Sequence, residues 1–554
     1  MGITGLWNML KPAGLRIFLT DLAAGNIDVY KSESQPHVQK VMVIGIDMGT
    51  FMDECAAATH SAGFHSTFSS GPLRPFFFRL CQLQKISANF VFVFDGPHRP
   101  SHKRGRAVQT HTELWWVNDA KRLIQAFGFS IHQAPGEAEA ELALLDRWGR
   151  IDAMWTSDSD SLVFGGQVVL RSIPKSEKWT DRLDEVELYS IGGIEHTTGL
   201  TLGQLVLFGL IAGGDYDENG LPGGGAVSAA QIARSPIGRS FEALLDVTTG
   251  VDDGKRLHAW RQSTHQVLAS MPAIGTRGKN ALSAHIRTFP SQEILSYYTH
   301  PSTSQTQPEY LPDSSSWSSI QQPNVQQLVK ICRERLHWED MVKLHETFYN
   351  NVWEGLILRL MFSTKCIWNP ELKTFGVPSR QLEVHGCKKM ATGAMNPGVK
   401  KDCARVGVRD NDIVCETLTE ELQRTFVAQA AVGKKAVVCR AWVPLALVPD
   451  WAFKLNEGSG KNYSNTRPLA GASGSGGGSV GSSRGPDVHL DGGASSGRSA
   501  GPSGQGVGSG GGVGTVGLGG TGGSVTSTSP LAVGADAALG MLDSSREVID
   551  LTED

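Results

Sequence analysis

The sequence predicts an α/β fold with a mostly parallel central sheet and helices on both of its faces. Segments 41–47 (VMVIGID) and 89–95 (NFVFVFD) are almost wholly apolar and rich in β-branched or aromatic residues, which is typical of buried strands. Segment 151–158 (IDAMWTSD) shows a weaker pattern of the same kind. Helical patterns precede the second and third segments, at 72–86 and 137–148. Strands and helices in alternation indicate parallel strands joined by crossover helices.

Each of the three predicted strands ends in an aspartate, namely Asp47, Asp95 and Asp158. Ligand sites in open α/β sheets lie beyond the carboxyl ends of the strands, so we expect these side chains to converge. Asp160 lies two residues beyond Asp158, which keeps both side chains on one side of an extended segment. A single strand-end aspartate is usually a cap, but several at one place repel one another and require a hard cation. Ligands that are oxygen atoms only favour Mg²⁺ or Mn²⁺.

Glutamates at the start of the second predicted helix are further candidates. Glu137 and Glu139 follow a Pro-Gly pair, which is a helix-start signature. Residues i and i+2 lie on opposite sides of a regular helix, so this pair shares a site only if Glu137 lies in an irregular first turn. On periodicity alone, Glu141 is the better companion of Glu137. We expect Asp146 and Asp152 to be solvated and to have no role in the site.

Segment 209–235 joins an apolar helix, an acidic turn, a glycine-rich loop and another helix (GLIAGGDYDENGLPGGGAVSAAQIARS). Asp215 lies in the acidic turn and is another candidate ligand. The loop is either flexible or a phosphate cradle, in which backbone N–H groups and a helix N-terminus face the anion. The candidate phosphate contacts are Gly220, Gly223, Gly224 and Gly225.

A short basic run follows the second predicted strand, at 98–106 (HRPSHKRGR). Such a run is usually a solvated loop, but just beyond Asp95 it is placed to neutralise a phosphate backbone. Its cations are Arg99, Lys103, Arg104 and Arg106. Trp115 and Trp116 could stack on bases, but we expect them to pack in the core.

Composition limits the class of protein. The net charge of −4 gives no global signature of nucleic-acid binding. Eight cysteines without a CxxC pair argue for reduced thiols in an intracellular protein and against a zinc site. No apolar run reaches the roughly 18 residues of a membrane helix, so we expect a soluble protein with no membrane partner. Gly and Ser dominate from about 458 to 523, so we expect 456–554 to be a disordered tail.

The order of these motifs resembles the XPG and flap-endonuclease family of structure-specific nucleases, over residues 1 to about 235. The motifs are MGITGLWNML, IGIDMGTF, FVFVFDGP, APGEAEAELA, TSDSDSLVFGG and GGDYDENGLPGGG. The resemblance implies a PIN-like core and a two-metal phosphodiesterase, with a helix–two-turn–helix element at about 209–235 that grips duplex DNA. Its metal ligands would be Asp47, Asp95, Glu137, Glu139, Asp158, Asp160 and Asp215.

The same resemblance implies roles for residues around these carboxylates. It favours Glu139 over Glu141 as the second glutamate, so we expect Glu141→Gln to have little effect on cleavage. Gly2, exposed once the first methionine is removed, would pack near the active site. Lys103 and Arg104 would stabilise the developing phosphate charge, with two Mg²⁺ ions, replaceable by Mn²⁺, as cofactors.

Two absences favour the Holliday-junction resolvase branch of this family. Only 41 residues separate Asp95 from Glu137, which is short beside the helical arch of flap endonucleases, and no sliding-clamp motif is present. We therefore expect a nuclear endonuclease that cuts branched double-stranded DNA and acts on four-way junctions as a homodimer. The alternatives are a flap endonuclease or 5′ exonuclease of the same chemistry, and a non-catalytic DNA-binding scaffold.

The domain organisation follows from these patterns. Residues 1–110 and 120–290 would form the two parts of the nuclease core, and 318–455 a chromodomain-like or all-helical module. The tail ends in EVIDLTED (547–554), which resembles a SUMO-interacting motif. In such a motif a short strand adds to an exposed sheet edge, and here its residues would be Val548, Ile549, Asp550 and Leu551.

Overall fold

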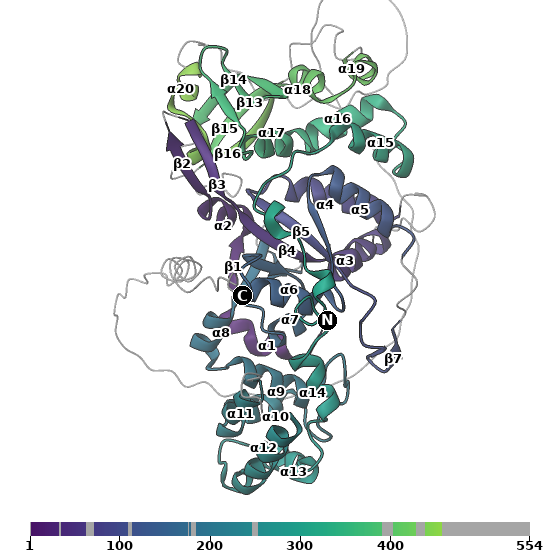
Figure 1. Ribbon diagram of the computed structural model, residues 1–554, viewed down its shortest axis with the longest axis vertical. Helices are drawn as coiled ribbons and strands as arrows, with labels where there is room; N and C mark the ends of the chain where they lie inside the picture. The colour runs from purple at the N-terminus through teal and green to yellow at the C-terminus, as the bar shows by residue number, and fades with distance from the viewer. Residues whose placement is uncertain are drawn as a thin grey trace, which may run out of the picture. The chain divides into compact units, whose positions relative to one another are not determined.

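The structure is a computed structural model of the chain (Figure 1). It describes residues 2–32, 35–61, 71–108, 114–174, 177–178, 184–245, 253–389, 403–427 and 438–456, all of which belong to one compact unit. The glycine- and serine-rich tail and the candidate SUMO-interacting motif lie outside the described residues.

A seven-stranded sheet forms the centre of the N-terminal part, with the strand order β1-β11-β10-β9-β4-β5-β8. Strands β10, β9, β4, β5 and β8 are parallel, and β11 and β1 add antiparallel pairs at one edge. The predicted fold class is confirmed. The strands are β1 (Leu15–Phe18), β4 (Met42–Asp47), β5 (Ala88–Phe94), β8 (Ser130–Gln133), β9 (Ala153–Trp155), β10 (Val168–Ser172) and β11 (Glu185–Ser190).

Helices cover both faces of this sheet (Figure 1). Alternate side chains of β5 point to opposite faces, so Phe90 and Phe92 pack into one hydrophobic core while Val91 and Val93 pack into the other. The first core includes α3 (Met48–Ser61), α4 (Leu73–Leu83) and α5 (Val117–Ala126). The second includes α1 (Leu6–Leu10), α6 (Ala138–Arg147), α7 (Asp160–Val163), α8 (Ile191–Thr198) and α9 (Leu202–Ala212).

The predicted helix–loop–helix element consists of α9, a loop at 213–225 and α10 (Ala226–Arg234). Gly223 and Gly225 have φ angles of 78° and 115°, which L side chains rarely adopt, so the loop depends on glycine there. Further helices follow, namely α11 (Pro236–Phe241), α12 (Asp253–Val267), α13 (Thr276–His285) and α14 (Gln292–Thr299). Among the described residues, no helix combines the length and apolar character needed to cross a bilayer.

The chain continues into a part that contains both helices and a sheet, so the all-helical alternative for 318–455 is wrong. Its sheet has five strands in chain order, all antiparallel. They are β12 (Ile367–Asn369), β13 (Thr374–Val377), β14 (Arg380–Lys389), β15 (Cys403–Arg409) and β16 (Val438–Pro444). The helices are α15 (Val325–Arg335), α16 (Met341–Asn351), α17 (Trp353–Met361), α18 (Asp410–Thr417), α19 (Glu420–Val427) and α20 (Asp450–Phe453).

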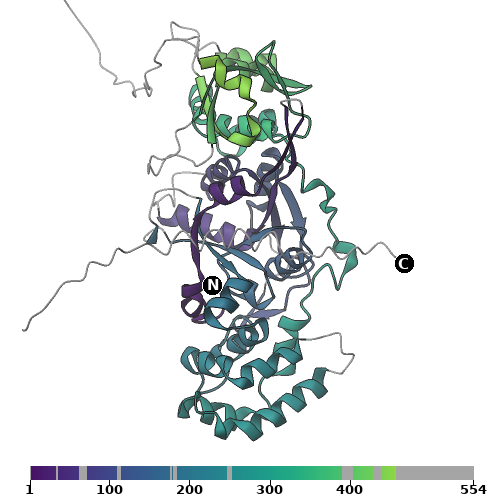
Figure 2. The same cartoon turned by 90° about the vertical axis from the view of Figure 1, so that its left-hand side faces the viewer.

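This C-terminal part contacts the N-terminal part at several places, among them the hairpin of β2 (Asp28–Ser32) and β3 (Gln35–Lys40) and the side chain of Arg359. The hairpin lies beside the C-terminal sheet, and the Gln35 side chain bonds the backbone of Trp368 through distances of 2.5 and 3.0 Å (Figure 2). On α17, the fully buried Arg359 reaches the Ala88 carbonyl at 3.5 Å and the Asn89 side chain at 3.4 Å. Burial lowers the pKa of Arg359 to about 9.

Candidate active site

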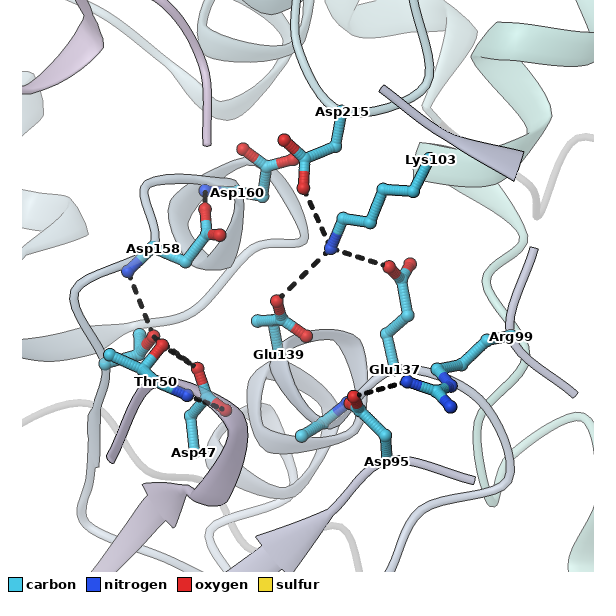
Figure 3. Close-up of polar contacts among 12 residues, drawn as sticks. Asp47, Thr50, Asp95, Arg99, Lys103, Glu137, Glu139, Asp158, Asp160 and Asp215 are labelled. Carbon is cyan, nitrogen blue, oxygen red and sulfur yellow. Dashed lines mark hydrogen bonds and ion pairs between the residues drawn. The ribbon is translucent and has the colours of Figure 1, made fainter. Parts of the chain in front are cut away.

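The carboxylates predicted as metal ligands come together at the carboxyl ends of β4, β5 and β9 (Figure 3). Asp47 is the last residue of β4, while Asp95 follows β5 by one residue and Asp158 lies in the turn after β9. Asp160 begins α7, and Asp215 lies in the loop after α9. The parallel strands therefore present the aspartates at one edge, as the sequence predicts.

The two glutamates of the E-x-E motif reach the same place because their backbones differ. Glu137 is the N-cap of α6 and has extended φ and ψ angles of −82° and 139°, whereas Glu139 lies within the first helical turn. Lys103 contacts both, with its Nζ 2.9 Å from Glu137 Oε1 and 3.5 Å from Glu139 Oε1. Glu141 is fully buried away from this cluster and forms a hydrogen bond with His132. The structure thus places Glu139, and not Glu141, in the cluster of carboxylate side chains.

Lys103 occupies the middle of the cluster (Figure 3). It ends the two-residue strand β6 (His102–Lys103), which pairs with β7 (Arg106–Ala107). Its Nζ also lies 2.8 Å from Asp215 Oδ2, and Arg104 Nε lies 2.7 Å from Asp215 Oδ1. Burial alone would lower the pKa of Lys103, but the three carboxylates raise it above its usual value. Lysine supplies part of the positive charge that the cluster needs.

Three hydroxyl side chains hold the carboxylates in place, and sequence reasoning missed all of them. Thr50 and Thr156 donate their hydroxyls to Asp47 Oδ2 at 2.5 and 2.8 Å. Tyr216 donates its hydroxyl to Glu137. The Thr156–Asp47 and Tyr216–Glu137 contacts join segments far apart in the chain, whereas Thr50 lies only three residues after Asp47. The signals that could have found these side chains were the closeness of Thr50 to Asp47 and the position of Tyr216 directly after Asp215.

The cluster fits divalent cations by its chemistry. Burial, followed by repulsion from Asp158, raises the pKa of Asp160, and burial raises that of Asp47 to about 6. Asp158 Oδ2 and Asp160 Oδ1 are buried and have no hydrogen-bond partner, which is costly for a carboxylate without a cation. Among the residues described, no three of the cluster carboxylates place ligand oxygens within 4.8 Å of one another, because they surround Lys103. A hard, oxygen-preferring ion would draw them closer.

Gly2 lies against the aspartates, as the resemblance implies. A Cβ atom on Gly2 would lie 2.2 Å from Asp158 Oδ1 and 2.6 Å from Asp160 Oδ1, so no side chain fits. Its φ angle of 83° also disfavours any other residue. A cavity of about 520 Å³ opens beside it, with Trp7 and Arg104 among its lining residues.

Some cations of the basic run at 98–106 contact the carboxylate cluster, and others lie on the surface. Arg99 Nη1 lies 3.0 Å from Asp95 Oδ2 and so faces the carboxylates, whereas Arg106 is exposed on β7. Arg277 on α13 is a cation that the sequence analysis missed: its Nε donates to the Gly223 carbonyl at 3.0 Å, beside the glycine loop. Only the folded chain brings α13 to this loop.

The two tryptophans after the basic run have different environments. The expectation of core packing is confirmed for Trp116, which is 3% exposed. It is wrong for Trp115, which is 64% exposed. Trp115 therefore has a ring face that is free to contact a ligand.

The raised pKa of Asp47 makes metal-free protein sensitive to pH. Aspartate in an unfolded chain titrates near pH 4, whereas folded Asp47 titrates at about 6, so the folded state binds this proton more tightly. Its contribution to stability is present at pH below about 4 and is lost as the pH rises through about 6. We expect the melting temperature in EDTA to fall over this interval relative to Asp47→Asn, and excess Mg²⁺ to remove the difference. Parallel curves for the two proteins in EDTA would contradict this expectation.

Known proteins that are similar in sequence to this chain include nucleases, and one match covers part of the site. Residues 128–215 match the model of the XPG I-region, a range that includes Glu137, Glu139, Asp158, Asp160 and Asp215. The chain is 25% identical over 260 residues to flap endonuclease GEN homolog 1 of Mus musculus, covering 44% of this chain and 26% of that protein. It is 30% identical over 204 residues to flap endonuclease GEN-like 1 of Arabidopsis thaliana, covering 32% of this chain and 33% of that protein.

The fold also resembles a solved structure described as the Holliday junction-resolving enzyme GEN1 in complex with product DNA and Mg²⁺. That likeness has a TM-score of 0.56 and 24% identity, and covers 82% of this chain and 99% of the other. The chain spans about a quarter to a third of the length of the two curated relatives. In its I-region and in the relatives that it matches, this chain is similar to the XPG family of nucleases and to the GEN proteins within it, and its fold resembles theirs.

Proposed function

We propose that this chain is a Mg²⁺-dependent, structure-specific DNA endonuclease that cuts branched DNA, with four-way junctions as its substrate. The observation that carries the proposal is the convergence of seven carboxylates and Lys103 at the carboxyl ends of parallel strands. A non-catalytic scaffold would gain nothing from burying so many like charges, since each one costs stability without a cation. The names of the relatives, which are flap endonucleases, support the same chemistry.

Each group of residues has a role in this proposal. Two Mg²⁺ ions, replaceable by Mn²⁺, would supply an activated water and stabilise the leaving oxygen. One ion would be held mainly by Asp47, Asp95 and Glu137, and the other by Glu139, Asp158, Asp160 and Asp215. Lys103 and Arg104, released from the carboxylates they now pair with, would neutralise the phosphate as its charge develops.

The duplex would bind at the glycine loop and the basic hairpin. The loop ends at the N-terminus of α10, where free N–H groups suit a phosphate, and its candidate contacts remain Gly220, Gly223, Gly224 and Gly225. Arg99 and Arg106 would contact the backbone near the cleavage site, and the exposed Trp115 offers a stacking surface.

Arg277 gives this interface a quantitative test. If its guanidinium contacts a phosphate beside Gly223, Arg277→Gln should weaken binding to all DNA sequences alike. The slope of log affinity against log salt concentration should fall by about 1, as expected for the loss of one phosphate contact. Fluorescence anisotropy over a salt series measures this slope. His196→Asn, at an exposed position on α8, is the control, and an unchanged slope in Arg277→Gln would place the DNA elsewhere.

The choice of a junction over a flap rests on the segment between Asp95 and Glu137. Its described residues, 96–108 and 114–136, hold the β6–β7 hairpin, α5 and β8, and contain no helix that could form an arch. Residues 109–113 of this segment lie outside the described residues. A site without an arch can admit continuous strands, as a four-way junction requires. Paired incision would then need two copies of the chain on one junction.

The discriminating experiment is cleavage of a panel of four-way junctions, 5′ flaps, forks and nicked duplexes. We expect four-way junctions to be cut without a free end nearby, and a bulky block on a 5′ flap to have little effect. A cruciform plasmid should be linearised, because two subunits nick opposite strands in one binding event. Loss of flap cutting upon blocking, with an intact cruciform, would establish the flap-endonuclease alternative.

We also infer a nuclear location, from the resemblance to this family of DNA nucleases, and two interaction elements. Residues 318–455 would act as a chromodomain-like module, for which the five-stranded sheet and α20 offer a scaffold. Val548, Ile549, Asp550 and Leu551 would bind SUMO. Titration of a labelled peptide of residues 541–554 with SUMO tests this directly, and no binding at millimolar concentration would rule it out.

A further inference from the structure

A second group of metal-binding side chains lies far along the chain from the carboxylate cluster. Glu383 and His385 lie on β14, and Asp412 lies on α18. One ligand atom of each lies within 4.8 Å of the other two, and among the residues described this is the only such group. The proposed nuclease function uses none of these three residues.

The distances within this group suit ligands of one metal ion. His385 Nε2 lies 3.6 Å from Glu383 Oε2 and 3.7 Å from Asp412 Oδ2. Both distances are longer than a hydrogen bond. Ligands at 2.0–2.2 Å from a tetrahedral Zn²⁺ stand about 3.3–3.6 Å apart, close to the observed values. His385 Nε2 and Asp412 Oδ2 are both buried and make no hydrogen bond.

The local backbone explains how the three side chains meet. On β14, Leu382 and Val384 are buried in the core, so Glu383 and His385 share the opposite face. The pairing of β14 with β15 shifts register between Val384 and Gly386, which leaves His385 as the extra residue of a bulge. Bulges re-aim side chains and recur beside functional sites. Asp412 arrives from the first turn of α18, which packs against β14.

The charges agree with a metal ion better than with a simple ion pair. The gaps of 3.6 and 3.7 Å between His385 Nε2 and the two carboxylate oxygens are too long for hydrogen bonds and fit an ion that contacts all three side chains. Two carboxylates balance the charge of a divalent cation.

We propose that Glu383, His385 and Asp412 form a second divalent-cation site, of the mixed nitrogen and oxygen chemistry that Zn²⁺ prefers, with one coordination position left for water. The ion would fasten α18 to β14. Unlike the nuclease cluster, whose ligands are all oxygen atoms, this site should bind transition metals in the presence of excess Mg²⁺. These ligands are a histidine and two carboxylates, so the lack of a CxxC pair does not bear on this site.

Co²⁺ is the probe of choice, because its visible absorption reports a nitrogen ligand and low coordination number. The chain of residues 1–554, stripped of metal and held in excess Mg²⁺, should bind one Co²⁺ per chain with an intense visible band, and Zn²⁺ should displace it. His385→Ala should weaken binding by at least about 100-fold, since even loss of an outer-shell partner costs 10–100-fold. His196→Asn, at an exposed histidine, should bind as the unmodified chain does.

A second variant guards against misfolding of His385→Ala. The Glu383 side chain is 48% exposed, so Glu383→Gln should fold normally by circular dichroism and still weaken Co²⁺ binding by about 10-fold or more. Zn²⁺ should raise the melting temperature of the unmodified chain and of His196→Asn but not of His385→Ala. Unchanged Co²⁺ affinity and spectrum in both Glu383→Gln and His385→Ala, or no Co²⁺ band in the unmodified chain, would overturn the proposal. Neither Co²⁺ binding nor the melting temperature depends on DNA cleavage, so this test can fail or succeed independently of the proposed function.

Discussion

Asp158→Asn should reduce cleavage of a four-way junction by about 10²–10³-fold or more, while the affinity for DNA stays close to normal. Asp158 is almost fully buried and directs an unpartnered oxygen, Oδ2, into the cluster, whereas its Oδ1 accepts the Asp160 N–H at 3.0 Å. Asparagine has nearly the same shape, so the turn survives and the charge at the cluster is lost. Single-turnover cleavage and binding in Ca²⁺ separate the two effects.

The same substitution should leave stability intact, and this distinguishes loss of chemistry from loss of fold. Removing one of several repelling carboxylates should raise the melting temperature of metal-free protein, or leave it unchanged. Glu195→Gln, at an exposed position on α8, is the control and should cut normally. If Asp158→Asn retains cleavage, or if its DNA affinity falls in parallel with cleavage, the assignment of Asp158 as a metal ligand fails.

Glu141→Gln should show the opposite result: a loss of about 2 kcal/mol in the free energy of unfolding, with the chemical step nearly unchanged. Glu141 is fully buried, and its Oε1 lies 2.8 Å from His132 Nε2 while its Oε2 accepts the Ser304 backbone N–H at 2.8 Å. The Ser304 hydroxyl also donates to Glu141. A glutamine replaces one acceptor by an N–H₂ group, which leaves a buried donor facing another donor.

That Glu141→Gln has little effect on cleavage stays a prediction, and the expected loss of stability is added to it, because no sequence pattern indicates that residues near 304 reach α6. Urea denaturation in saturating Mg²⁺ measures the loss. Ser304→Ala is the matched control, since it removes the hydroxyl but keeps the backbone N–H, and it should cost less. Equal stability of Glu141→Gln and the unmodified chain would show that the network contributes nothing to folding.

The strands that sequence analysis found are those whose residues are almost all apolar, and burial does not separate them from the rest, because β11 is nearly as buried as β4 and β5. β4 and β5 read as apolar runs, whereas β11 carries Glu185 and Glu187 and escaped notice. The Glu187 carboxylate lies 2.9 Å from Arg171 on the neighbouring β10, and Glu185 lies 3.7 Å from Arg16 on β1. Charged residues in a strand can be neutralised by ion pairs with a neighbouring strand. Such a strand lacks the apolar pattern by which strands are recognised in sequence, and the ion-pair partners are known only from the structure.

The candidate site also contains features that the sequence predicts and features that only the structure reveals. Asp47, Asp95 and Asp158 were predictable because strand ends in a parallel sheet meet at one edge. The central place of Lys103 was not, because a two-residue strand carries no pattern. Asp146 was expected to be solvated, but it is buried and accepts the backbone N–H groups of Gln167 and Val168 at 2.6 and 2.9 Å. A buried aspartate that caps backbone groups and a solvated one look alike in sequence.

Arg359 has a consequence for how this chain can be cut into smaller pieces. Its guanidinium lies 4.6 Å above the Phe129 ring and also reaches the start of β5, so a C-terminal helix supplies part of the packing beneath the nuclease-like sheet. Asn89, in turn, donates to the Trp317 carbonyl at 2.6 Å. A fragment that stops before Trp317 would leave the Asn89 side chain and one of the two cores uncovered. The N-terminal part therefore depends on α15–α17 for its packing, and a truncation that removes these helices should yield insoluble protein.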